Sequence, residues 1–250
     1  MNLASTLFRP HRATVELTLL GVLYAAYEVA RGAADASLAV AREHTADIVA
    51  LERSVGVFAE RAVQAWAQGI PFLPAVLGFA YMSLHLGATG LAVRWVYRER
   101  PDAFPIVRTT LIASTALALV GYILFPAAPP RLAQLGFSDT VSASTGLDLS
   151  SDLLGALYNP FAAVPSLHFG YALIVGAVLA SIGGRRWVRA IGVAYPLAML
   201  LIIVATGNHF IVDAALGGLV VVVGWLAARA IVTSPEPRPQ RLTLANCPHA

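Results

Sequence analysis

Six long apolar stretches constrain the fold of this chain more than any other feature of its sequence. A helix needs about 20 mostly apolar residues to cross the hydrocarbon core of a bilayer, and each stretch approaches that length. The first is bounded by charged residues and the fourth is short. The sequence therefore predicts an all-α integral membrane protein, a bundle of six transmembrane helices. The predicted spans are residues 14–31, 72–94, 108–126, 168–183, 190–206 and 209–228.

The composition agrees with a membrane bundle. Of the 250 residues, 58% are hydrophobic and 12% are charged, and the mean hydropathy is +0.70. Soluble domains contain about 25% charged residues, so this chain belongs to the membrane class. The six spans leave no room for a separate soluble domain. We expect a single domain over residues 1–232 and a disordered cytoplasmic tail, rich in proline and arginine, over 233–250.

The basic residues indicate how the chain crosses the membrane. All 17 are arginines, and the net charge of +3 is spread along the chain, so no nucleic-acid-binding face is expected. If the N-terminus is inside, twelve of the 17 flank the inner ends of the spans. Cytoplasmic loops carry such an excess of basic residues. The sequence thus predicts a multi-pass protein of the plasma (inner) membrane with both termini in the cytoplasm.

The loop after the first span carries an amphipathic pattern. Asp47, Arg53, Glu60 and Arg61 lie largely opposite an apolar stripe, which predicts one helix lying in the membrane interface. A helix packed across the mouth of the bundle fits the same pattern. A second outer segment, 127–167, is expected to contain a short helix at 151–158 that begins after Ser150. The stripe consists of Ile48, Leu51, Val55, Phe58, Ala62 and Trp66.

Three polar groups lie close to the ends of the predicted spans. They are Arg131, the pair Ser166 and His168, and the pair His209 and Asp213. Polar side chains near a membrane are costly and therefore suggest function. His168 and His209 are 41 residues apart, which corresponds to two short spans and the turn between them. All three groups are thus expected at the outer mouth of the bundle.

These residue types suit phosphoryl transfer. His209 and Asp213, four residues apart, share one helix face, so the carboxylate can fix the imidazole tautomer and leave the other nitrogen as a nucleophile. His168 can protonate a leaving oxygen and later activate water or an alcohol. Arg131 offers a planar fork of donors to phosphate oxygens, and Ser166 adds a hydroxyl and a helix start. No metal and no other cofactor is required.

Other interpretations of the same residues stay open. A single histidine near a span end is usually an interfacial or capping residue. Taken alone, His-x-x-x-Asp also fits one half of a metal site. A six-span transporter or metal carrier would use the histidines as ligands. A serine hydrolase using Ser166 and His209 is disfavoured because no Gly-x-Ser-x-Gly elbow is present. The single Cys247 excludes an intramolecular disulfide.

At these motifs the chain resembles the type-2 phosphatidic acid phosphatase (PAP2) superfamily. Pro-Ser-x-His at 165–168 is followed by His-x-x-x-Asp at 209–213, in the order and spacing of that family. The run Phe-Pro-x-x-Pro-Pro-Arg at 125–131 looks more like its inositolphosphotransferase branch, which includes inositol phosphorylceramide synthases. The resemblance covers residues 108–228, the expected catalytic part. It implies a membrane-embedded lipid phosphoester phosphotransferase or phosphatase at the extracytoplasmic face, working through a phosphohistidine.

The resemblance assigns a role to each matching residue. His168 takes the place of the general acid, His209 that of the nucleophile and Asp213 that of its orienting carboxylate. Two departures make the phosphate site poor in cations: the chain has no lysine for the first motif, and Ile203 stands where the third motif has arginine. Arg131 is also not followed by proline. These departures favour a transferase over a lipid or polyprenyl phosphate phosphatase.

Further candidates surround this core. Asn208 is a helix cap or a phosphate contact. Tyr27 and Arg31 are candidates for headgroup binding, and a Glu28–Arg31 pair on one helix face is the alternative for Arg31. His85 is placed too deep in its span for the outer mouth. The expected partners are the lipid bilayer and a lipid phosphate or phospholipid substrate, with no nucleic acid. The donor lipid, the acceptor and the oligomeric state are left open by the sequence.

Overall fold

The computed structural model describes residues 9–32, 37–146 and 159–233, and within these ranges the chain is helical and forms no strand. The predicted short helix at 151–158, its Ser150 cap and the tail beyond Thr233 lie outside the described residues. The helices are α2 (Arg9–Gly32), α3 (Leu38–Ser54), α4 (Glu60–Gln68), α5 (Leu73–Glu99), α6 (Phe104–Leu124), the 3-10 helix η1 (Pro130–Leu132), α7 (Thr140–Thr145), α9 (Leu167–Ile182), α10 (Arg186–Ala205) and α11 (Ile211–Thr233).

The long helices follow the predicted apolar stretches. Among the described residues, four helices, α5, α6, α10 and α11, are long and apolar enough to cross a membrane, and α9 is a shorter apolar helix of 16 residues. The prediction of an all-α membrane protein is therefore confirmed. Helix α2 covers the first predicted span but is not among the four, and its Glu16 is paired with Arg108 of α6 at 2.6 Å. The count of six spans stays a prediction.

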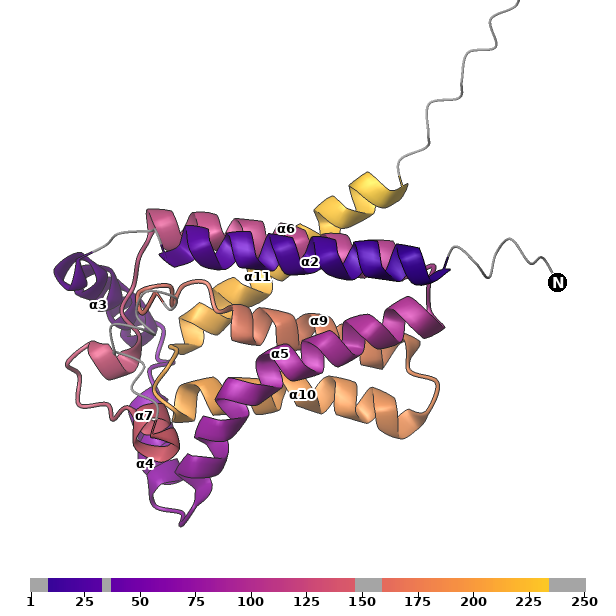
Figure 1. Ribbon diagram of the computed structural model, residues 1–250. Coiled ribbons are helices and arrows are strands. Elements are labelled where there is room, and N and C mark those ends of the chain that lie inside the picture. The colour runs from indigo at the N-terminus through magenta and orange to yellow at the C-terminus, as the bar shows by residue number, and fades with distance from the viewer. Residues whose placement is uncertain (1–8, 33–36, 147–158, 234–250) are drawn as a thin grey trace, which may run out of the picture.

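The helices form a bundle in which the three sequence motifs meet at one end. Helix α9 packs along α10, and α11 crosses both α6 and α9. Figure 1 shows α2 beside α6, and α3, α4 and α7 gathered at the same end of the bundle. Helix α11 approaches the start of α9 so closely that a Cβ at Gly217 would overlap the carbonyl oxygen of Ser166. Only glycine permits this contact, which places the third motif against the second.

Helices α3 and α4 differ from the single amphipathic helix expected here. The chain leaves α3 at Ser54 and turns through Gly56, whose φ of +74° suits glycine, before α4 begins. Most of the predicted apolar stripe lies on the surface of the protein, where Leu51, Val55 and Trp66 are each more than half exposed, whereas Ile48 is buried. The prediction that Glu60 lies on the polar, solvated face was wrong, since its side chain is fully buried. Both helices pack across the mouth of the bundle, with α4 on α10 and α5 and α3 on α11.

Candidate active site

Three loops meet at the mouth of the bundle, one for each sequence motif. The amide of Ala127 donates to the carbonyl of Phe161 at 2.9 Å, which joins the first loop to the segment before α9. The amide of Arg131 donates to the carbonyl of Gly207 at 3.0 Å, which joins it to the turn before α11. Helix α3 supports the first loop, because the hydroxyl of Thr45 donates to a carbonyl within it at 2.9 Å. Backbone hydrogen bonds thus bring the three motifs together.

His209 lies in the turn that leads into α11. Its Nδ1 is 3.3 Å from the Oδ2 of Asp213, and the same oxygen accepts a hydrogen bond from the amide of Phe210 at 2.9 Å. Asp213 is the third residue of α11, so its carboxylate serves both the free N–H groups of the helix start and the imidazole. Asp213 is fully buried and His209 is 5% exposed. The ring is therefore held in one orientation by a carboxylate that water does not reach.

His168 faces His209 from the first turn of α9. Ser166 is the N-cap of that helix: its Oγ accepts from the amide of Phe169 at 3.4 Å, and its own amide donates to the carbonyl of Asp213 at 2.9 Å. These bonds fix where the helix begins. The ring centroids of His168 and His209 are 5.6 Å apart. A phosphorus atom between the two rings would be within reach of both.

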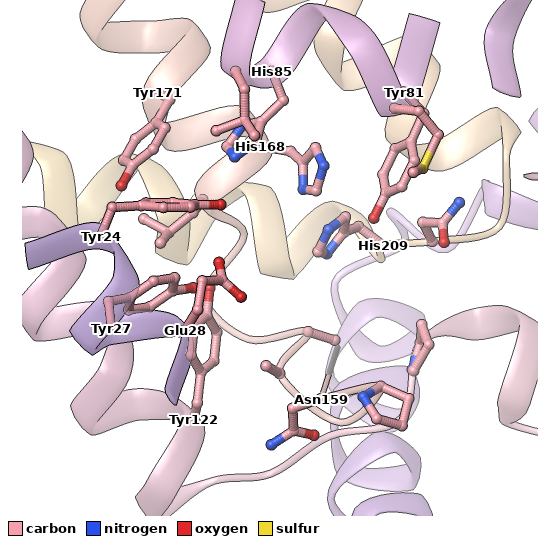
Figure 2. A pocket seen from close by; sticks show the side chains of 18 residues that line it. Tyr24, Tyr27, Glu28, Tyr81, His85, Tyr122, Asn159, His168, Tyr171 and His209 are labelled. Atoms are coloured by element: carbon pink, nitrogen blue, oxygen red, sulfur yellow. The ribbon is translucent and has the colours of Figure 1, made fainter. Parts of the chain in front are cut away.

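The two histidines line a cavity of about 230 Å³. Figure 2 shows His168 and His209 on one side of it and Tyr27, Glu28 and Tyr122 on the other. The described residues that line the cavity carry one carboxylate, that of Glu28, and include no arginine. Its polar lining consists of Tyr24, Tyr27, Glu28, Tyr81, His85, Tyr122, Asn159, His168, Tyr171, Asn208 and His209.

The place of His85 differs from the prediction. His85 was expected to lie too deep, yet it lines the same cavity, and its ring centroid is 4.2 Å from that of His168. The cavity extends inward between α5 and α9, so a residue two turns or more into α5 still reaches it. Tyr81, one turn before His85, stacks on the ring of His168 with centroids 4.2 Å apart. Sequence reasoning missed both, although their spacing of four residues puts them on one helix face.

Arg131 is buried and bonded rather than open to the cavity. Its side chain is 2% exposed, its Nη1 donates to Oδ1 of Asn208 at 2.8 Å, and its Nε is 3.4 Å from Oδ2 of Asp139. Asn208 lines the cavity next to His209, while its Nδ2 donates to the hydroxyl of Thr206 at 3.0 Å. Asn208 is therefore not the cap of α11, since that helix begins at Ile211. Arg131 is thus linked to the wall of the cavity through the side-chain amide of Asn208.

The headgroup candidates on α2 divide into two cases. Tyr27 is 8% exposed and lines the cavity, as does its neighbour Glu28. The side chain of Arg31 lies outside the described residues, so its predicted pairing with Glu28 is not tested. Tyr171 is buried and also lines the cavity, with its hydroxyl 2.5 Å from that of Thr115. The far wall of the cavity thus carries phenols and a carboxylate.

Two buried carboxyl groups hold the start of α11 from the opposite side. Glu60 Oε1 accepts from the amide of Ile211 at 3.0 Å, and Glu52 Oε1 accepts from the amide of Val212 at 2.7 Å. Both side chains are fully buried. Burial raises the pKa of Glu52 to about 8, the Val212 hydrogen bond opposes this, and the hydrogen bond and charge of Glu60 add to it. The sequence gives no signal for this pair, since glutamates in an amphipathic loop are usually solvated.

The described residues contain no cluster of side chains suited to a metal ion. Within ranges 9–32, 37–146 and 159–233, no group of three or more His, Cys, Asp or Glu side chains is arranged to hold a metal ion. His209 and Asp213 are instead bonded to each other. The geometry is that of a histidine hydrogen-bonded to a buried carboxyl group and facing a second histidine.

Comparison with known proteins identifies the family. The profile of the PAP2 superfamily matches residues 46–228, more than half of the chain. This chain belongs to the PAP2 superfamily. The match includes the second half of α3, all of α4 and the three motif loops, so this part of the mouth of the bundle belongs to the family domain.

Two individual proteins are similar to this PAP2 protein. The phosphoinositol dihydroceramide synthase of Bacteroides thetaiotaomicron is 31% identical over 134 residues, which are 44% of this chain and 40% of that protein. The chain therefore matches less than half the length of this curated relative. The crystal structure of Aquifex aeolicus LpxE is similar over 67% of this chain and 92% of its own, with a TM-score of 0.49 and 16% identity.

Proposed function

We propose that this protein is a membrane-embedded lipid phosphotransferase that carries the phosphoryl group or phospho-headgroup of its donor on His209. The observation that carries the proposal is the bond between Nδ1 of His209 and Asp213 at 3.3 Å, opposite the ring of His168. With Nδ1 engaged, Nε2 is the nitrogen left to attack phosphorus. Family membership and the similarity to a phosphoinositol dihydroceramide synthase support the same reaction class.

The reaction takes two displacements at phosphorus. In the first, Nε2 of His209 attacks, the bond from phosphorus to the lipid oxygen breaks, and His168 in its protonated form gives that oxygen a proton. The buried carboxylate of Asp213 stabilises the positive charge on the phosphorylated imidazole. In the second, neutral His168 takes the proton of an incoming hydroxyl, whose oxygen attacks phosphorus as the P–N bond breaks. His209 returns to its neutral form.

The charge of the cavity favours a phosphodiester over a phosphomonoester. A phosphomonoester carries close to two negative charges at neutral pH, because its second pKa is about 6, and a diester carries one. Glu28 lines the cavity, the described lining residues include no arginine, and Arg131, which contacts the lining residue Asn208, also lies beside Asp139. A dianion would be poorly compensated here. The phenols and the carboxylate on the far wall suit a hydroxyl-rich headgroup such as inositol.

The orientation in the membrane is part of the proposal. We assign six spans, both termini to the cytoplasm and the site to the extracytoplasmic face, from the arginine bias of the loops. The arginine-rich turns lie at the end of the bundle away from His209, where Arg100 donates to the carbonyl of Ile182 at 3.3 Å. In this arrangement α3 and α4 cover the site on the outer side. The orientation is tested with single cysteines introduced at Arg61 and Arg186. The measurement is whether an impermeant thiol reagent reaches each of them.

The test of function is turnover of a lipid panel by the purified protein and its His209→Ala variant. Phosphatidylinositol, phosphatidic acid, phosphatidylglycerol phosphate and a polyprenyl phosphate are offered with and without a long-chain alcohol. We expect a new phosphodiester that depends on His209. With phosphatidylinositol as donor, mass spectra of the protein quenched in base should show His209 carrying the phosphorus with the inositol still attached. Release of inorganic phosphate alone would make the protein a phosphatase. Absence of both products would favour the alternative that the protein is a six-span transporter or metal carrier.

A further inference from the structure

A second cavity adjoins the reaction cavity and is apolar. It has a volume of about 620 Å³ and lies between α2, α5 and α6. The two cavities share four lining residues, Tyr24, Tyr27, Leu86 and Tyr171. Among the described residues that line the second cavity, none is charged. The two spaces are thus neighbours across a boundary made mainly of phenol rings, polar on one side and apolar on the other.

The apolar cavity runs along the helices, away from the histidines. On α6 its lining extends from Leu119 to Leu111, which is about 12 Å at 1.5 Å per residue. On α5 it extends from Leu86 to Val93 in the same direction. One leaflet of a bilayer is about half of the roughly 30 Å hydrocarbon core, so the cavity has the depth of one leaflet. Its long axis therefore matches that of a lipid tail whose headgroup lies at the reaction cavity.

Small residues keep this space open. Gly21 of α2 and Gly90 of α5 both line it, and a Cβ built on either would meet no atom within 4 Å. Alanines on α2 and α6, Ala26, Ala30 and Ala116, line it as well. Larger side chains at these positions would fill the cavity without disturbing the packing around it. The space is a consequence of residue choice along three helices.

We infer that this cavity holds one hydrocarbon chain of the donor lipid while its phosphoester lies at His209. The inference rests on the proposed function and adds the part of the substrate that the histidines do not contact. Tails already lie in an apolar medium, so the transfer of a chain from bilayer to cavity gains little hydrophobic free energy. The cavity acts instead by position: a chain held between α2 and α5 aligns the phosphorus with Nε2 of His209.

The test fills the cavity and compares long with short donor chains. Gly90→Leu places a larger side chain in the cavity, and Gly87→Leu, on the same helix and also with open space around its Cβ, is the matched control outside it. The substrates are phosphatidylinositol with two oleoyl chains, in nanodiscs, and its dihexanoyl analogue. We expect Gly90→Leu to lower kcat/KM for the long-chain donor at least about tenfold, or 1.4 kcal/mol, and to leave the short-chain donor unchanged. Equal effects on both donors, or none, would overturn the inference.

A second measurement does not depend on turnover. Phosphatidylinositol with a photoreactive diazirine in one acyl chain is cross-linked to the wild-type protein and to both glycine variants. Cross-links should map to the lining of the cavity, be lost in Gly90→Leu and persist in Gly87→Leu. Labelling scattered over the lipid-facing surface would refute the chain site. If labelling is as expected and no product depends on His209, the chain site stands and the proposed reaction fails.

Discussion

Nη1 of Arg131 donates to Oδ1 of Asn208 at 2.8 Å, one residue before His209. The amide of Arg131 also donates to the carbonyl of Gly207 at 3.0 Å, so two bonds join the first motif loop to the third. The guanidinium thereby positions the turn that carries His209 and polarises the amide that lines the cavity.

The first prediction is that Arg131 and Asn208 act as a unit. Arg131→Ala and Asn208→Ala should each lower kcat/KM about tenfold or more, and the double variant should lose little beyond the worse single one. Residues in one hydrogen-bond network show coupling energies of about 0.5–3 kcal/mol. The double-mutant cycle of Arg131→Ala and Asn208→Ala is measured with one donor lipid at fixed ionic strength. Strictly additive losses would mean that the two residues act separately.

The second prediction concerns the proton given to the leaving group. His168→Asn should lower kcat about 10²–10⁴-fold on a natural lipid donor, because an alkoxide leaves poorly without protonation. On a nitrophenyl phosphodiester, whose leaving group is stable as an anion, the loss in the first step should be much smaller. A burst of nitrophenolate followed by slow turnover is the expected signal. His209→Ala is the control and should be inactive on both substrates.

The third prediction is a pH dependence of stability that comes from Glu52. Its folded-state pKa of about 8 lies above its ordinary value of 4.5, so folded protein binds more protons than unfolded protein between these values. The stabilisation is full below pH 4.5 and is lost as pH rises through about 8. Glu52→Gln, which keeps the neutral shape, should flatten this slope.

The measurement for Glu52 is the apparent melting temperature of the detergent-purified protein from pH 5 to 9. Glu43→Gln, an exposed change on the same helix, is the matched control and should follow the wild type. Parallel pH profiles for all three proteins would contradict the assignment. Glu60→Gln should alter the profile as well, because its hydrogen bond and charge contribute to the raised pKa.

The fourth prediction tests the close approach of α11 to α9. Gly217→Ala would drive a methyl group into the backbone carbonyl of Ser166, whereas the methyl of Gly218→Ala would meet the side-chain end of Leu173 at 3.3 Å. Overpacking of this kind costs typically 1–3 kcal/mol. Gly217→Ala should therefore lower the melting temperature and the activity, and Gly218→Ala should change both much less. Equal tolerance of both would mean that the two helices can separate without cost.

The sequence was sufficient for the helices and for the meeting of the motifs. The apolar stretches predicted where α5, α6, α9, α10 and α11 lie, because a membrane imposes a fixed length on each span. The spacing of His168 and His209 predicted that both reach one end of the bundle, where their rings are 5.6 Å apart. Both predictions depend on the number of residues in a span, which can be read directly from the sequence.

The sequence was not sufficient for contacts between distant segments. His85 was misplaced because depth along one helix does not show how far a cavity extends between two. Glu60 was assigned to solvent because its buried partner, the amide of Ile211, is 151 residues away. The break at Gly56 went unrecognised because the spacing of apolar residues continues across it. In each case the missing information was the tertiary neighbour.

The two carboxyl groups at the start of α11 also set an order of assembly. Glu52 and Glu60 leave the ribosome long before their partners, the amides of Val212 and Ile211, which are 160 and 151 residues further along. Chains fold largely from the N-terminal side as they are made. Until α11 is in place, these carboxyls have no helix start to bind and the Ser166 amide lacks the carbonyl of Asp213. The site is therefore completed only when α11 packs against the helices made before it, and a chain that stops before α11 would lack Asp213.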